Sequence, residues 1–300
     1  MIFYEITTTS DKFIGFLLFF NTGYLSYQVF PFTRVAKKQL NGFKQNHPKK
    51  QIGLFIGNVF QYNRKADEYL RCINSQNPDV VMLVETDLWW AEKLEVLKEK
   101  YPYQLLAPSE NTYGMMLFSK FELQDERVEF LVEDNIPSMH TLIKLPSGDL
   151  IKFHGLHPTP PVPQENPRST ERDKEILLIG KDSKESKHPV IVAGDLNDVA
   201  WSYTTELFSK ISGLLDPRKG RGFFNTFHAK YLFLRFPLDH IFCSNDFTLV
   251  NIKRMPSCGS DHFPMYIKLQ YSPEEVVRQE EPKADQEDQK TASEKINKPT

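Results

Sequence analysis

The sequence predicts an α+β protein built as a layered sandwich, in which two mixed β-sheets carry helices on their outer faces. From Gln51 onward, short apolar runs of strand length alternate with helix-like segments. The strand-like segments outnumber the helical ones and fall into two broad halves of the chain. The 300 residues are 40% hydrophobic and 25% charged, which is ordinary for a globular protein with a sizeable core.

The individual elements follow from apolar periodicity and from the residues that interrupt it. Helices are expected over residues 65–75, 89–100 and 165–181. Strands are expected over residues 52–56, 79–84, 114–118, 128–131, 141–144, 151–154, 190–193, 238–243, 247–254 and 264–269. The strand at 190–193 is the clearest, because four apolar residues lie between Pro189 and Gly194.

Residues 13–30 form the longest apolar stretch, and roughly 20 apolar residues suffice to span a bilayer. Four polar residues interrupt this stretch, namely Asn21, Thr22, Ser26 and Gln28. A membrane segment and a helix packed in the protein core are therefore both open interpretations. Basic residues follow directly and favour a cytoplasmic location for the rest of the chain if this is its only span.

The chain divides into three parts by composition. Residues 1–48 hold the hydrophobic segment and a basic linker, and residues 49–271 hold the main domain. Residues 272–300 are rich in charged side chains and contain few large apolar ones, so this tail is predicted to be disordered.

Charge and cysteine content exclude several classes of protein. The formal net charge is −2, which argues against a broadly basic surface that coats nucleic acid, although a local basic cleft remains open. The three cysteines are widely spaced and contain no CxxC pair, so neither a disulfide framework nor a zinc ribbon is indicated. Any metal is expected to bind oxygen and imidazole ligands.

Polar side chains suited to phosphate chemistry follow several predicted strands. Asn58 follows the strand at 52–56, Glu85 ends an apolar run, and Asp195 and Asn197 follow the strand at 190–193. A buried carboxylate is costly unless it is paired or bound to a metal. Turn formation is the simpler explanation for any one of these residues taken alone.

Histidines and further carboxylates occupy comparable positions. His157 follows the strand at 151–154, and Asp239 lies at the start of a later strand. Ser260, Asp261 and His262 place a carboxylate beside an imidazole, a pair suited to proton transfer near neutral pH.

Taken in order, these residues resemble the endonuclease/exonuclease/phosphatase superfamily. The resemblance rests on Asn58, Glu85 after Val-Val-Met-Leu-Val, Tyr-Gly-Met-Met-Leu-Phe-Ser-Lys at 113–120, His157, Gly-Asp-Leu-Asn at 194–197, Asp239 and Ser-Asp-His at 260–262. It covers residues 50–270 and implies a DNase I-like, four-layer α/β/β/α sandwich. The apolar segment followed by Phe-Pro-Phe-Thr at 30–33 is similar to a bacterial subgroup with an N-terminal membrane segment.

The resemblance implies a site that uses Mg²⁺, with Mn²⁺ as a substitute. Glu85 would be the principal metal ligand, Asn58 would help to hold the metal or its water, and Asp261 would be a further carboxylate nearby. These oxygen ligands suit a hard cation, which prefers few carboxylates together with water and phosphate.

The remaining residues have implied roles in the hydrolysis itself. Asp195 would position the attacking water. His262 would be the general base or an imidazole that contacts phosphate, oriented by Asp239. Asn197 and His157 would donate hydrogen bonds to non-bridging phosphate oxygens, where negative charge needs fixed donors.

Three further residues are predicted to bind substrate. Arg172 could reach a second phosphate, whereas a solvated helix residue is the simpler interpretation. Trp201 could stack on a base or lie in a lipid interface, although burial is also expected for tryptophan. Tyr113 opens the 113–120 segment of the resemblance.

The sequence thus predicts a Mg²⁺-dependent phosphoesterase and leaves its substrate open between nucleic acid and a phospholipid or polyprenyl phosphate. A location at the membrane or in the cytoplasm is equally open. A catalytically silent binding module is the weaker alternative, because the residues needed for hydrolysis are all present.

Overall fold

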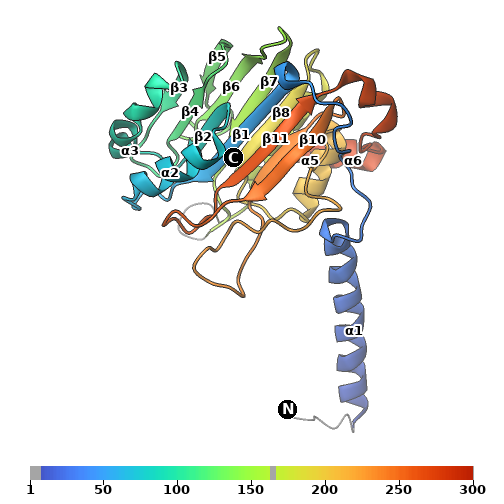
Figure 1. The fold of residues 1–300 in the computed structure, drawn as a ribbon. Coiled ribbons are helices and arrows are strands. Elements are labelled where there is room, and N and C mark those ends of the chain that lie inside the picture. Colours follow the sequence, from blue (N-terminus) through green and yellow to red (C-terminus); the bar gives the residue numbers. More distant parts are fainter. Residues whose placement is uncertain (1–7, 163–166, 300) are drawn as a thin grey trace.

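The computed structural model describes residues 8–162 and 167–299, and within these ranges two β-sheets lie face to face (Figure 1). The first sheet has the order β10 (Phe247–Arg254), β11 (Met265–Tyr271), β1 (Gln51–Asn58), β2 (Val80–Val84), β4 (Met115–Ser119) and β3 (Tyr103–Ala107). The second has the order β5 (Leu123–Glu129), β6 (Ser138–Lys144), β7 (Leu150–Leu156), β8 (Val190–Asp195) and β9 (Asp239–Cys243).

The main hydrophobic core lies between the two sheets. It contains side chains such as Leu54, Met82, Phe153 and Ile191, each almost fully buried. The middle parts of β1, β2 and β8 are apolar because both faces are covered, one by the other sheet and one by helices. The pairs β1/β2 and β7/β8 are parallel, and all other pairs are antiparallel.

Helices cover the outer face of each sheet. The first sheet carries α2 (Ala66–Gln76) and α3 (Leu88–Lys93), with Tyr69 and Trp90 packed against its strands. The second sheet carries α4 (Thr170–Lys184) and α5 (Tyr203–Ser212), with Ile176 and Phe208 packed beneath them. The predicted α/β/β/α sandwich is therefore confirmed.

Several predicted element boundaries differ from the structure. The helix expected at 89–100 is divided into α3 and a 3₁₀ helix, Glu95–Glu99. The strand expected at 128–131 belongs to β5, which begins at Leu123. The helix expected at 165–181 is α4, which begins at Thr170; residues 165 and 166 lie outside the described ranges. Strand β3 and helix α5 have no counterpart in the prediction.

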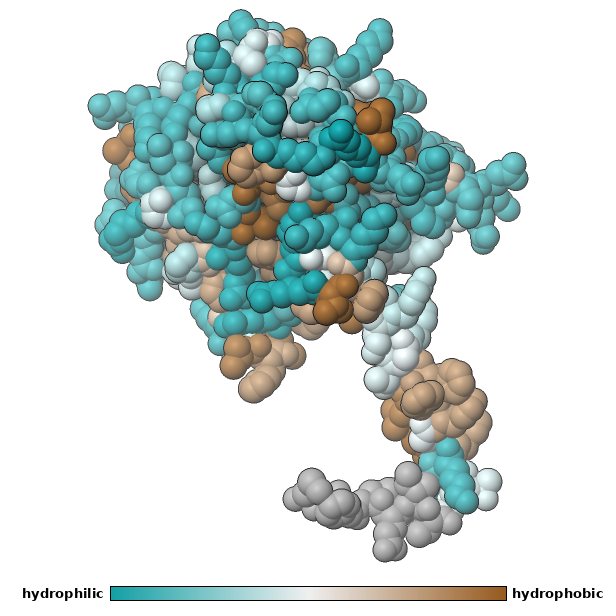
Figure 2. All heavy atoms as spheres, turned by 45° about the vertical axis from the view of Figure 1, so that its right-hand side comes forward, coloured by the Kyte–Doolittle hydropathy of each residue, from teal (hydrophilic) through white to brown (hydrophobic). Residues whose placement is uncertain are grey.

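Helix α1 (Thr9–Val29) extends away from the sandwich and has no buried residue (Figures 1 and 2). Thr8 caps its first turn in a capping box with Asp11, and a 3₁₀ helix, Phe30–Phe32, continues it. The combined helical stretch, Thr9–Phe32, is long and apolar enough to cross a membrane. The alternative of a helix packed in the core of this chain is wrong.

The charged tail is not a disordered segment in the structure. It forms a 3₁₀ helix, Pro273–Arg278, and helix α6 (Gln286–Asn297). Ala292 is fully buried against α4 and α5, while Lys295 pairs with Asp173 at 2.6 Å and Lys210 pairs with Asp288 at 3.0 Å. The tail therefore folds without a large apolar face, because its contact with α4 and α5 uses the small side chain of Ala292 and two ion pairs.

Candidate active site

Four of the predicted site residues meet where strands of both sheets end, and we call this place the site edge. Asn58 is the last residue of β1, Glu85 follows β2, and Asp195 is the last residue of β8. Asp239 begins β9 directly opposite Asp195. Strands β1 and β2 contact β8 across the sandwich, so the ends of the two sheets lie against each other.

Asn58 links the carboxylates of the two sheets. Its Nδ2 donates to Oε1 of Glu85 at 2.6 Å and to Oδ2 of Asp195 at 3.1 Å. Glu85 has a left-handed backbone (φ 60°), and its Oε2 accepts a hydrogen bond from the backbone of Gln61 at 3.2 Å. The predicted neighbours Asn58, Glu85 and Asp195 therefore lie together in one site.

Glu85 is a largely buried carboxylate without a cationic side chain beside it. Burial raises its pKa to about 7, and the hydrogen bonds from Asn58 and Gln61 only partly offset this effect. Among residues 8–162 and 167–299, no lysine or arginine forms an ion pair with it. Asp261 lies close enough that its charge also raises the pKa of Glu85. Glu85, Asn58 and Asp261 carry oxygen atoms of the kind that a hard divalent cation prefers. Among the described residues, however, the group of possible ligands whose atoms lie within 4.8 Å of one another is Asp195, Asp239 and His262.

His262 lies between two carboxylates. Its Nδ1 is 2.7 Å from Oδ2 of Asp239, and its Nε2 is 3.5 Å from Oδ2 of Asp195. Burial alone lowers the pKa of His262, but the charges of Asp239 and Asp195 and the hydrogen bond to Asp239 raise it to about 10. His262 is therefore an imidazolium at neutral pH.

The two carboxylates beside His262 differ. Burial raises the pKa of Asp239. Burial also acts to raise the pKa of Asp195, but the charges of His262 and His157 and the hydrogen bonds from Asn197 and Asn58 bring the pKa below its ordinary value. The pKa values of the two carboxylates therefore shift in opposite directions, downward for Asp195 and upward for Asp239.

His157 and Asn197 lie beside Asp195. Burial lowers the pKa of His157 to about 4, so its ring is neutral at pH 7. Its Nδ1 is buried and has no hydrogen-bond partner within the described part of the chain. Asn197 has a left-handed backbone (φ 50°); its N–H donates to Asp195, and its Nδ2 donates to the carbonyl of Pro158 at 2.9 Å.

The three residues predicted to bind substrate lie at different depths. Tyr113 is buried with its ring 5.2 Å from that of His157, which places it at the site. Arg172 is only 8% exposed, pairs with Asp173, and donates to the carbonyl of Asn197 at 2.8 Å. Arg172 is therefore neither a solvated helix residue nor an unpaired cation.

Trp201 packs against two other aromatic rings. Its ring is 6.1 Å from that of Phe32 and 5.9 Å from that of Phe223, both edge to face. It therefore packs at the point where the helical stretch of α1 joins the sandwich.

Sequence reasoning missed several residues that hold the site. The hydroxyl of Thr226 accepts the backbone N–H of Asp239 at 3.2 Å. Arg218 is buried, donates to the carbonyl of Asp239 at 3.1 Å and pairs with Asp216 at 2.7 Å. These residues lie in a loop between α5 and β9, where no apolar period or motif distinguishes them.

Comparison with known proteins gives a family and a fold. The sequence profile of the Endonuclease/Exonuclease/phosphatase family matches residues 57–262, while no curated protein gives a significant match. Similar solved structures include D. rerio TDP2 complexed with single-strand DNA product, at 17% identity and a TM-score of 0.62, covering 73% of this chain and 99% of that one.

Two further structures are similar. The human Nocturnin catalytic domain with bound sulfate anion has 17% identity and a TM-score of 0.60, covering 74% of this chain and 95% of that one. A protein from Beutenbergia cavernae described as an endonuclease/exonuclease/phosphatase has 17% identity and a TM-score of 0.59, covering 74% of this chain and 72% of that one. At these identities the structures establish the fold alone.

Proposed function

Because the chain belongs to the endonuclease/exonuclease/phosphatase family, whose members are typically phosphoesterases, we propose that it is a Mg²⁺-dependent phosphoesterase that hydrolyses its substrate by attack of water. The observation that carries this proposal is the buried Glu85 carboxylate, which has no cationic side chain of its own and lies one amide away from Asp195.

Mg²⁺ would be held by Glu85, with Asn58 and Asp261 as neighbouring oxygen donors, and Mn²⁺ could replace it. The bound cation would supply positive charge to the oxygens of the substrate phosphate. Before the metal binds, Nδ2 of Asn58 donates to Glu85, so the amide must present Oδ1 instead if Asn58 is to become a ligand.

Asp195 would position the attacking water by accepting a hydrogen bond from it. Its pKa lies below the ordinary value, so the carboxylate is ionised and can accept hydrogen bonds from water at neutral pH. The backbone N–H of Asn197 and the side chain of Asn58 hold its two oxygens in place.

His262 would contact the phosphate as an imidazolium. A group with a pKa of about 10 is a poor general base at neutral pH, but it is a strong hydrogen-bond donor to a developing negative charge. Asp239 accepts from Nδ1 and leaves Nε2 directed toward Asp195 and the substrate. This arrangement favours the second of the two roles predicted for His262.

Asn197 and His157 would bind the non-bridging phosphate oxygens. The unpartnered Nδ1 of His157 needs a hydrogen-bond partner, which a phosphate oxygen or a water would provide. Arg172 would act through Asn197 by holding its carbonyl, and Tyr113 would support the ring of His157.

We further propose that the substrate is a membrane lipid that carries a phosphoester, either a phospholipid or a polyprenyl phosphate. Helix α1 leaves ten apolar residues exposed, from Phe13 to Tyr27, and the net charge of −2 gives no general attraction to a polyanion. The competing substrate class is nucleic acid, since the structurally similar D. rerio TDP2 is complexed with single-strand DNA.

A substrate panel tests both proposals. The full-length protein in detergent is incubated with Mg²⁺ and plasmid DNA, RNA, phosphoinositides, sphingomyelin or polyprenyl pyrophosphate, beside a His262→Ala control. Turnover of a lipid but not of DNA or RNA supports the lipid class, and the reverse result assigns nucleic acid. No Mg²⁺-dependent turnover of these substrates or of a generic phosphodiester would leave a silent binding module.

A further inference from the structure

We propose that the loop of residues 228–236 is a second membrane-contacting element, which places the site edge against the surface of an anionic phospholipid bilayer. This inference rests on the proposed membrane-lipid substrate, and it takes Thr9–Phe32, which is long and apolar enough to cross a membrane, as the segment that enters the bilayer. The loop tip is apolar and points into solvent: Tyr231 is 58% exposed, Leu232 65%, Phe233 94% and Leu234 58%. Adjacent exposed side chains of this size are characteristic of a binding surface.

The loop and α1 project from the same side of the molecule. In Figure 1 both extend below the sheets, α1 in blue and the loop between α5 and β9 in brown. Figure 2 shows hydrophobic surface on the lower part of the sandwich and on α1 when the molecule is turned by 45°. A bilayer entered by α1 therefore lies on the side to which the loop tip points.

Two basic side chains beside this apolar tip lie over aromatic rings, Lys230 over Phe60 at 5.9 Å and Arg235 over Phe263 at 5.0 Å. Lys230 and Arg235 flank the tip in sequence, and Arg34 follows the helical stretch of α1. Within residues 8–162 and 167–299, no carboxylate forms an ion pair with any of these three. Apolar side chains with flanking cations suit the boundary between acyl chains and anionic headgroups.

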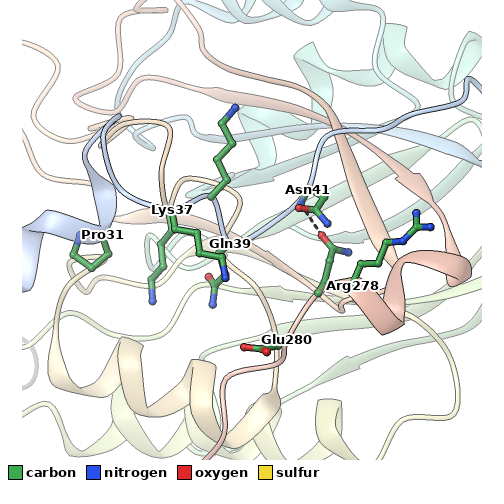
Figure 3. Close-up of a pocket in the computed structure, with 9 residues that line it drawn as sticks. Pro31, Lys37, Gln39, Asn41, Arg278 and Glu280 are labelled. Carbon is green, nitrogen blue, oxygen red and sulfur yellow. Dashed lines mark hydrogen bonds between the residues drawn. The ribbon is translucent and has the colours of Figure 1, made fainter.

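Two cavities near the end of α1 add to this charge. One, of about 330 Å³, is lined by Pro31, Lys37, Lys38, Lys219, Arg278 and one acidic residue, Glu280, among others (Figure 3). The other, of about 370 Å³, is lined by Arg34, Arg221 and Arg254 together with Phe223 and Phe224, and no acidic residue lines it. In the first cavity Lys219 and Arg278 are already paired with Glu206 and Glu275. The second cavity, with three arginines and no carboxylate, suits the phosphate of a lipid headgroup better than it suits a cation.

The base of the loop lies on the catalytic groups. The ring of Phe227 is 5.0 Å from that of His262, and the N–H of Ala229 donates to the carbonyl of Asp261 at 2.6 Å. A backbone hydrogen bond also joins Phe263 to Thr226, whose hydroxyl holds Asp239. A loop fixed by the bilayer would therefore also hold His262 and Asp239 beside the lipid surface.

Fluorescence at the loop tip tests the inference directly. The full-length Phe233→Cys protein carries an environment-sensitive dye and is reconstituted into vesicles of phosphatidylcholine and phosphatidylglycerol. The native Cys72, Cys243 and Cys258 are buried, so labelling favours the new thiol, and wild type treated with dye gives the background. Ser147→Cys is the matched control, because residue 147 lies in the exposed turn before β7, opposite the site edge.

The inference predicts a blue-shifted dye at position 233 that spin-labelled lipids quench, and a solvent-like dye at position 147. Equal, solvent-like spectra at both positions would overturn it. A dye at position 233 that is shielded from water but not quenched by lipid would also overturn it, because a second copy of the chain would then cover the tip.

A variant of the loop tip distinguishes failure of this inference from failure of the proposed function. Leu232→Ser with Phe233→Ser should still float with vesicles and hydrolyse a soluble phosphodiester, but should lose about tenfold in hydrolysis of vesicle-bound substrate. Unchanged hydrolysis of vesicle-bound substrate contradicts the loop inference. Failure of the wild type to float refutes the α1 anchor, and absence of Mg²⁺-dependent diester hydrolysis refutes the phosphoesterase.

Discussion

The two carboxylates that share the amide of Asn58 lie in opposite electrostatic environments. Glu85, on the first sheet, has a pKa raised to about 7 by burial, whereas Asp195, on the second sheet, has a pKa below its ordinary value. Both accept hydrogen bonds from Nδ2 of the same residue, so hydrogen bonding to Asn58 is not the source of the difference.

The difference comes from His262. Its Nε2 is 3.5 Å from Asp195, and its charge is the largest influence that lowers the pKa of that residue, whereas for Glu85 it ranks behind two hydrogen bonds. Asp195 therefore has the imidazolium of His262 beside it as a cation. The charge of Glu85 has no such cation beside it and is left for a bound metal ion. The hydrogen-bond partners of Glu85 are the amide of Asn58 and the backbone of Gln61, neither of which is a cation, and this is why we propose Glu85 as the metal ligand.

Replacing Glu85 by Gln should have the largest effect. The variant keeps the shape but loses the charge that Mg²⁺ needs, so kcat/KM for a phosphodiester should fall by about 10⁴-fold. In EDTA the same variant should be more stable than wild type by about 2 kcal/mol, because a buried unpaired charge has been removed. Steady-state kinetics measure the activity, and denaturant unfolding measures the stability. A variant that loses stability as well as activity would contradict the difference inferred between Glu85 and Asp195.

Asp195→Asn is the matched change on the other side and should give the opposite stability effect. Activity should fall by about 10³-fold, because the attacking water loses its acceptor. Stability should also fall, by about 2 kcal/mol, because His262 loses one of its two counterions. Unfolding in EDTA checks this, and an Asp195→Asn protein that is more stable than wild type would show that the two sides are alike.

Much of this comparison could not have been predicted from the sequence. Glu85 and Asp195 were identifiable because each follows an apolar run that could only be a buried strand. Their pKa values depend on which side of Asn58 the ring of His262 lies, and residue 262 is distant from both in sequence. The distances from the His262 ring to the two carboxylates are determined only by the packing of the two sheets.

The fold was likewise only partly predictable from the sequence. Apolar strands and the strand-end residues were predictable because burial on both faces leaves a clear sequence signal. Helix α6 was not, because its contact uses Ala292 and ion pairs to α4 and α5 in place of an apolar stripe. Arg172 was assigned to phosphate for a related reason, since its pairing with Asp173 and with the carbonyl of Asn197 is set by tertiary structure.

Asn197→Gly should have a smaller effect than either carboxylate change. Glycine tolerates the left-handed backbone at this position, so the variant removes the amide without adding strain. Loss of one donor to the phosphate should lower kcat by about 10²-fold and leave Mg²⁺ affinity unchanged. Kinetics across a Mg²⁺ titration separate kcat from Mg²⁺ affinity. A weakened Mg²⁺ affinity would indicate that Asn197 helps to hold the metal and does not only bind the phosphate.

The most gradual expected effect is the pH dependence of stability. For Glu85 the folded pKa of about 7 lies above the ordinary value of 4.5, so stability in EDTA is complete below pH 4.5 and is lost as pH rises through 7. For His262 the loss extends from pH 6.5 through about 10. The slope from either group is at most roughly 1.4 kcal/mol per pH unit. Unfolding curves at several pH values should show Glu85→Gln lacking the first loss and retaining the second.

Calorimetric titration of Mg²⁺ into wild type and Glu85→Gln is the most direct test of the metal position. Wild type should bind about one equivalent, with release of nearly one proton at pH 6 and little release at pH 8, because Glu85 must ionise before it can bind. Glu85→Gln should show no such binding. Equal Mg²⁺ binding by the two proteins would show that Glu85 is not the metal ligand.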